Sequence, residues 1–168
     1  MYIKKYLSEF VYGATDGTIT TFAIIAGSIG ATLTPAIVVI LGFSNVLADG
    51  FSMASSNYLA SKSEKYLGEG SGKDPLKTAF VTFISFVVVG SIPVVPFLIS
   101  IFVPSFAKSE LIVASIATGV AFIIIGYIKG VVTNRSTFKA AAETLLIGGF
   151  AAFIAFYVGR ILANLLGV

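Results

Sequence analysis

Charged residues divide this chain into long apolar stretches. Uncharged runs cover residues 17–48, 50–61, 78–107, 111–128 and 144–159. A helix crosses the hydrocarbon layer with about 20 apolar residues, so the first run is long enough to cross, turn and return. The turn is expected at Thr32-Leu33-Thr34-Pro35, because proline and the neighbouring hydroxyl residues favour a break between two helices.

This pattern predicts five transmembrane helices in an all-α, polytopic membrane protein. Strands of a membrane barrel would need alternation with a period of two, whereas the run Phe86-Val87-Val88-Val89 is apolar on every side. Helices are therefore favoured, and residues 1–168 are expected to form a single transmembrane domain. The expected helices cover residues 10–33, 35–66, 76–102, 110–128 and 138–166.

Prolines and small residues modify this scheme. Pro93 and Pro96 lack a backbone N–H, so we expect a kink or a break in the second half of the third helix. Gly13 and Gly17 have the small-xxx-small spacing that lets two helices approach closely. Packing inside one bundle is a simpler explanation of this spacing than a dimer contact. Residues 61–77 are expected to form a short hydrophilic linker.

Composition supports a membrane protein and limits its chemistry. The 168-residue chain is 57% hydrophobic and 11% charged, with a mean hydropathy of +0.98. Soluble domains have roughly 25% charged residues. The chain contains no cysteine and no histidine, which excludes disulfides and any thiolate or imidazole metal site. A metal ion would be held by oxygen atoms or by methionine sulfur.

The basic residues sort by membrane side and do not suggest a nucleic-acid partner, although the sequence pI is about 9.2. Cytoplasmic loops of membrane proteins are enriched in lysine and arginine. Only Lys108 and Arg160 flank the far side in the five-helix scheme, so the N-terminus is expected in the cytoplasm. The near side carries Lys4, Lys5, Lys62, Lys65, Lys73, Lys77, Lys129, Arg135 and Lys139.

Two aspartates are expected at membrane depth. Asp16 and Asp49 bracket the first uncharged run. A carboxylate at bilayer depth costs about 2.5 to 3.5 kcal/mol on insertion scales, so it is kept where it faces a polar interior and has a partner. The two carboxylates together indicate a cation site that serves transport.

Neighbouring residues would add ligands to this site. Asn45, Asp49 and Met53 follow one another at i, i+4 and so stack on one helical face, while Thr20 lies one turn after Asp16. Oxygen ligands suit hard or borderline divalent ions, whereas methionine sulfur favours transition metals over Mg²⁺ or Ca²⁺. Fe²⁺ or Mn²⁺ fits this set best, as a transported ion and not as a permanently bound cofactor.

The same residues also have structural explanations. Asp16 would cap the first helix, Asp49 would bond to a neighbouring helix, and Met53 would fill a gap. Glu143 is a third acid near bilayer depth, and it either forms an i, i+4 ion pair with Lys139 or takes part in gating. We expect no enzyme, because the chain has neither a P-loop nor a nucleophile with a histidine base.

Several stretches of the chain resemble the vacuolar iron transporter family. They are DGTITTFAIIAG at residues 16–27, ADGFSM at 48–53 and YLASKSE at 58–64. The likeness continues with PVVPF at 93–97, then Lys129-Gly130 and Arg135-Ser136, and ETLLIGG at 143–149. Because these stretches run from the first expected helix to the last, the resemblance covers essentially the whole chain.

The resemblance implies a five-helix homodimer that moves Fe²⁺, and often Mn²⁺, out of the cytosol in exchange for protons. The family's aspartate on the first helix and methionine on the second line the ion path between the two protomers, and they correspond to Asp16 and Met53. Plant and fungal members carry a metal-gathering insert between their second and third helices. Residues 61–77 are too short for such an insert, which implies a nodulin-like or prokaryotic branch.

The chain departs from its implied relatives on the second helix. Those members tend to have a glutamate where Asn45 stands and a small residue where Asp49 stands. The acid is therefore displaced by one helical turn. Metal selectivity need not follow that of the relatives.

We predict a proton-coupled exporter of Fe²⁺ or Mn²⁺, an integral multi-pass protein in contact with lipid. Its membrane would be the plasma membrane in a prokaryote and a vacuolar or other organelle membrane in a eukaryote. Two alternatives remain open at this point. One is a carrier or channel for another divalent cation, such as Mg²⁺, without proton exchange. The other is a structural module that assembles with a partner and carries no metal.

Overall fold

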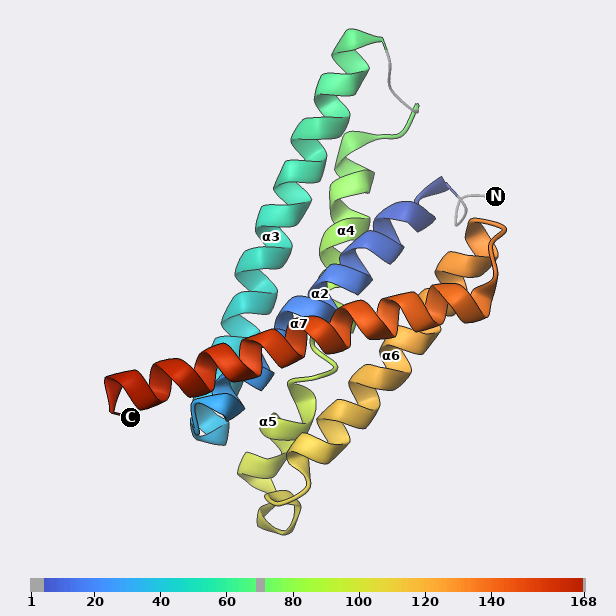
Figure 1. Ribbon diagram of the computed structural model, residues 1–168. Coiled ribbons are helices and arrows are strands. Elements are labelled where there is room, and N and C mark those ends of the chain that lie inside the picture. Colours follow the sequence, from blue (N-terminus) through green and yellow to red (C-terminus); the bar gives the residue numbers. More distant parts are fainter. Residues whose placement is uncertain (1–4, 69–71, 168) are drawn as a thin grey trace.

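The computed structural model describes residues 5–68 and 72–167, and helices make up nearly all of this part of the chain (Figure 1). No strand is present within these two ranges, so the prediction of an all-α fold is confirmed. The α-helices are α2 (Leu7–Gly30), α3 (Pro35–Leu67), α4 (Pro75–Gly90), α5 (Val95–Phe102), α6 (Glu110–Val132) and α7 (Thr137–Leu166), and a 3-10 helix, η1, covers Pro104–Phe106.

The hairpin between α2 and α3 lies where the sequence places it. Thr32 adopts a positive φ of 57° in the turn, and α3 begins at Pro35. Proline suits the first turn of a helix, because the N–H that it lacks would have no partner there. α2 begins and ends slightly before the expected range of 10–33, and α6 extends past residue 128 to Val132.

The expected third helix, residues 76–102, is two helices. α4 ends at Gly90, α5 begins at Val95, and their axes differ in direction by 47°. Pro93 and Pro96 are both buried at or just after the break, where neither can donate a backbone hydrogen bond. The Ser91 hydroxyl, directly after α4, donates to the Val87 carbonyl at 2.6 Å. The predicted break is therefore present, but one continuous helix is not.

The number of membrane spans is only partly settled by helix length and composition. Within the described residues, α3, α6 and α7 are each long and apolar enough to cross a membrane. The bent pair α4 and α5 adds a fourth span if the two helices cross as one. α2 is not in this group, since glycines, threonines, Glu9 and Asp16 interrupt its apolar residues. A fifth span therefore stays a prediction.

α2 is the central helix of the bundle, because it packs against α3, α4, α6 and α7. Figure 1 shows α7 crossing α2, with α3 and α4 side by side. Glycines make the closest crossings possible. A Cβ on Gly17 would lie 2.7 Å from the Phe86 carbonyl oxygen, and a Cβ on Gly90 would lie 3.0 Å from the Gly17 carbonyl oxygen. Gly13 also faces α4, so this glycine spacing serves packing inside the bundle.

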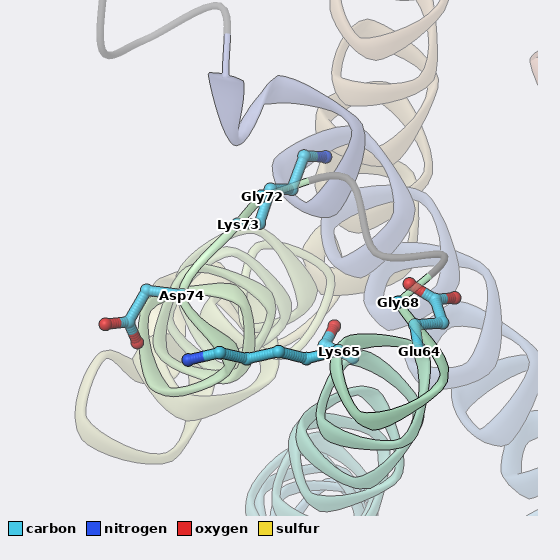
Figure 2. Close-up of a pocket in the computed structure, with 7 residues that line it drawn as sticks. Glu64, Lys65, Gly68, Gly72, Lys73 and Asp74 are labelled. Carbon is cyan, nitrogen blue, oxygen red and sulfur yellow. The ribbon is translucent and has the colours of Figure 1, made fainter.

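A largely buried ion pair joins the start of α2 to the connection between α3 and α4. Lys73 Nζ lies 2.7 Å from Glu9 Oε1, and these side chains are only 20% and 10% exposed, respectively. The Tyr6 hydroxyl accepts a hydrogen bond from the Asp74 backbone N–H at 3.2 Å. Figure 2 shows the adjoining hollow, where the Lys73 side chain points away from Lys65 and Asp74. The ion pair and the Tyr6 hydrogen bond hold the N-terminal end of α2 in place, which is the end nearer to Asp16.

We expect Lys73→Met to destabilise the protein by about 1 to 3 kcal/mol, since removing one partner of a largely buried ion pair leaves the other charge unpaired. Glu9 would be that charge. Thermal unfolding in detergent measures the effect, with Lys77→Met as the control on an exposed neighbour. The double variant Glu9→Gln/Lys73→Met should recover much of the lost stability. Equal melting temperatures for Lys73→Met and Lys77→Met would contradict a structural role for the pair.

Candidate ion-binding site

A cavity of about 390 Å³ lies between α2 and α3. It brings together Asp16 of α2 with Asp49 and Met53 of α3, three of the residues singled out in the sequence. Both aspartates are partly buried. The complete lining comprises Tyr12, Asp16, Asp49, Ser52, Met53, Ser56, Asn57 and Ala60.

The α3 side of the cavity follows from helical periodicity. Asp49, Met53 and Asn57 recur every four residues and so share one face of α3. Asn45 belongs to the same series but does not line the cavity. Its Nδ2 atom is buried and has no hydrogen-bond partner among the described residues. The structure therefore places Asn45 one turn beyond the cavity.

Thr20 is not brought into the cavity, in contrast to the expectation from its position one turn after Asp16. Its hydroxyl donates to the backbone carbonyl of Asp16 at 2.9 Å. This back-bonding is common for threonine within helices, because the carbonyl four residues earlier lies within reach of the hydroxyl. The hydroxyl proton is thus committed to the helix backbone.

Tyr12 and Asn57 are among the lining residues that were not identified from the sequence. Tyr12 precedes Asp16 by four residues, and Asn57 follows Met53 by four. The same i, i+4 rule would have found both if the series had been extended by one turn in each direction. Asn57 Nδ2 also donates to Thr82 Oγ1 at 2.7 Å, which links the cavity wall to α4. That contact joins residues far apart in the chain and has no signal in the sequence.

The donor set of the cavity is mixed. Within residues 5–68 and 72–167, no group of three or more Asp, Glu, His or Cys side chains is placed to hold a metal ion. Asp16 and Asp49 supply carboxylate oxygens, and Met53 supplies a thioether sulfur. Hydroxyl and amide groups make up the rest of the polar lining. Such a set can hold a divalent cation of borderline softness.

Comparison with known sequences identifies the family. A sequence model of the VIT family matches residues 7–71 and 66–160, which together are most of the chain. The chain belongs to the VIT family. The family resemblance noted in the sequence is thereby confirmed, and the matched residues include all the polar side chains that line the cavity.

Vacuolar iron transporters of two plants align with nearly the full chain, and that of a Plasmodium species aligns with about a third of it. Vacuolar iron transporter 1 of Eucalyptus grandis is 26% identical over 218 residues, covering 93% of this chain and 86% of that protein. Vacuolar iron transporter 1 of Arabidopsis thaliana is 24% identical over 222 residues, covering 95% and 87%. The vacuolar iron transporter of Plasmodium berghei is 43% identical over a shorter stretch of 61 residues, covering 36% of this chain and 22% of that protein.

This VIT-family chain is short. The Eucalyptus alignment runs over 218 residues, whereas the chain has 168, so that relative carries stretches that are missing here. The two family matches meet at residues 66–71, between α3 and α4.

Glu143 does not line the cavity and lies at the contact between α6 and α7. The i, i+4 spacing suggested an ion pair with Lys139. The Glu143 carboxylate instead pairs with Lys129 of α6 at 3.1 Å. α6 and α7 pack together here, which brings Lys129 to the carboxylate. The side chains are 39% and 58% exposed, and surface pairs of this kind are worth about 0 to 1 kcal/mol.

Proposed function

We propose that this VIT-family protein exports Fe²⁺ or Mn²⁺ from the cytosol in exchange for protons. The observation that carries the proposal is the joint lining of one cavity by Asp16, Asp49 and Met53. Two carboxylates and a thioether match the preference of borderline transition-metal ions. The names of the relatives, which are iron transporters, support the same metal class.

Proton exchange follows from the chemistry of the carboxylates. A carboxylate must be deprotonated to bind a metal ion, so a proton and the ion compete for the same oxygen atoms. Asp16 and Asp49 would take up protons on the side where the metal leaves and release them where it enters. This competition couples the two flows without nucleotide hydrolysis. The metal is the transported substrate and not a resident cofactor.

A homodimer is part of the proposal. One protomer offers two carboxylates at the cavity, and the described residues supply no third acid beside them. Tyr12, which lines the cavity, is 59% exposed, so the cavity is accessible from the surface of the single chain. A second copy facing it would add the matching Asp16 and Met53. Such symmetric pairing is the commonest form of oligomer.

Metal uptake into proteoliposomes with an imposed pH gradient tests this function. We expect wild-type protein to accumulate Mn²⁺ only while the gradient exists. Met53→Ala should lower Mn²⁺ uptake, because the variant lacks the soft ligand. Added Mg²⁺ should also inhibit the remaining Mn²⁺ uptake more strongly than it inhibits uptake by the wild type. Leu59→Ala is the matched control, since Leu59 is an exposed residue of α3 outside the cavity.

Two outcomes would favour the alternatives. Mg²⁺ uptake that ignores both the pH gradient and the Met53→Ala substitution would indicate a hard-ion carrier or channel without proton exchange. Absence of both metal binding and flux in correctly folded protein would indicate a structural module. Asp16 and Asp49 would then be buried polar groups that serve assembly.

A further inference from the structure

Asn57 occupies an unusual position in the cavity wall. It lies on α3 one turn after Met53, and its Nδ2 atom donates to Thr82 Oγ1 of α4 at 2.7 Å. Thr82 is completely buried. The Nδ2 atom of Asn57 is therefore held in the protein interior. Asn57 also lines the cavity, together with the two carboxylates.

The orientation of this amide follows from the hydrogen bonds of Thr82. A threonine hydroxyl has one proton to donate and lone pairs to accept. The Thr82 hydroxyl donates its proton to the Thr78 carbonyl at 2.9 Å, so only its lone pairs remain for Asn57. Asn57 must then present its NH₂ group, and not its carbonyl, to Thr82. The nitrogen and oxygen positions of this amide are thus set by the network.

The Asn57 carbonyl oxygen is consequently available as an acceptor. No hydrogen bond to Oδ1 is present among the described residues. Ser56, the neighbouring hydroxyl residue in the cavity lining, is exposed, so the region can hold a hydrated ion. Amide oxygens are common ligands of hard and borderline divalent cations. Asn45, the other amide of the series, does not line the cavity and cannot take this role in the structure.

We propose that Asn57 Oδ1 is a ligand of the divalent cation held between Asp16 and Asp49, and that Thr82 is the residue that positions it. This inference rests on the proposed transport function. The amide would add a neutral oxygen that binds the ion without competing for protons. Metal affinity would then depend on Asn57 and Thr82, whereas proton exchange would depend on the aspartates.

Direct Mn²⁺ binding to the purified full chain in detergent tests the ligand, with electron paramagnetic resonance used to measure free Mn²⁺. We expect Asn57→Leu to weaken Mn²⁺ binding by at least about 10-fold, since loss of even an outer-shell partner of a metal ligand typically costs about 10- to 100-fold in affinity. Asn57→Asp retains an oxygen ligand, so it should bind Mn²⁺ at least about 10-fold more tightly than Asn57→Leu. Asn164→Leu, the same substitution at an exposed position of α7, should leave binding unchanged.

The positioning role has its own pair of variants. Thr82→Val removes the hydroxyl at nearly constant volume and should weaken Mn²⁺ binding by about 10-fold. Thr82→Ser keeps the hydroxyl and should bind Mn²⁺ like the wild type. Thr144→Val is the matched control, because Thr144 is also buried and its hydroxyl donates to a carbonyl four residues earlier. Melting temperatures recorded for every variant separate lost binding from lost folding.

The outcomes distinguish this inference from the function on which it rests. If Asp16→Asn abolishes Mn²⁺ binding while Asn57→Leu binds like wild type, the function stands and the role of Asn57 is wrong. If Thr82→Val lowers only the melting temperature, the hydrogen bond serves packing and the positioning role is wrong. If Asp16→Asn itself binds Mn²⁺ like wild type, both the function and the inference fail.

Discussion

Asp16→Asn is expected to abolish metal uptake into proteoliposomes. The substitution keeps the shape of the side chain but removes its charge and its ability to exchange a proton. The cavity would retain only one carboxylate, Asp49, beside the neutral groups. Because removing even an indirect partner of a metal ligand costs about 10- to 100-fold in affinity or activity, loss of a carboxylate ligand should reduce Mn²⁺ uptake by at least that much.

The control for Asp16→Asn is the matching acid-to-amide change at an exposed site. Glu64→Gln, near the end of α3, should transport like wild type. Asp49→Asn tests whether the second acid is equally necessary, since Asp49 lines the same cavity. Wild-type uptake by folded Asp16→Asn would overturn the assignment of this cavity as the transport site.

Gly17→Ala should destabilise the bundle by about 1 to 3 kcal/mol, the usual cost of adding a group to a packed interior. The new Cβ would lie 2.7 Å from the Phe86 carbonyl oxygen and 3.0 Å from the Phe86 ring. Neither α2 nor α4 can yield locally, because these atoms belong to, or stand directly on, a helix backbone. For a chain of this size, such a loss lowers the melting temperature by roughly 2 to 4 °C per kcal/mol.

Gly119→Ala is the matched control for Gly17→Ala. A Cβ at Gly119 of α6 would meet nothing within 4 Å. Alanine is a better helix former than glycine by about 1 kcal/mol, so this variant should melt at the same temperature or slightly higher. Thermal unfolding in detergent compares the two variants directly. A melting temperature for Gly17→Ala equal to that of Gly119→Ala would mean that α2 and α4 do not cross as closely as described.

The acid on α7 illustrates how spacing can mislead. Glu143 and Lys139 have the i, i+4 separation of an ordinary helical pair, yet the carboxylate contacts Lys129 of α6. Such pairs within a helix gain only about 0.2 to 0.5 kcal/mol, which is too little to determine the partner of a side chain. The packing of α6 against α7 determines it. Sequence spacing shows which residues share a face, but not what that face meets.

Some positions in the cavity follow from spacing within one helix, whereas others depend on how two helices pack. Asp49 and Met53 share a face of α3 because of local helical geometry, which the sequence contains. Thr20 was expected beside Asp16 on the same grounds, but its hydroxyl bonds to the helix backbone. The contact between Asn57 and Thr82 joins two helices and depends on how α3 packs against α4. No pattern within either helix predicts it.

Local patterns in the sequence are enough to predict the helical class, the hairpin at Pro35, the break near Pro93 and the family of this protein. These features depend on apolar runs, on proline's missing N–H and on motifs, all of which are local. The 47° angle between α4 and α5, the contact between Lys73 and Glu9, and the set of side chains that line the cavity appear only in the folded chain. Those features depend on contacts between side chains of different helices and connections, which form only when the whole chain has packed.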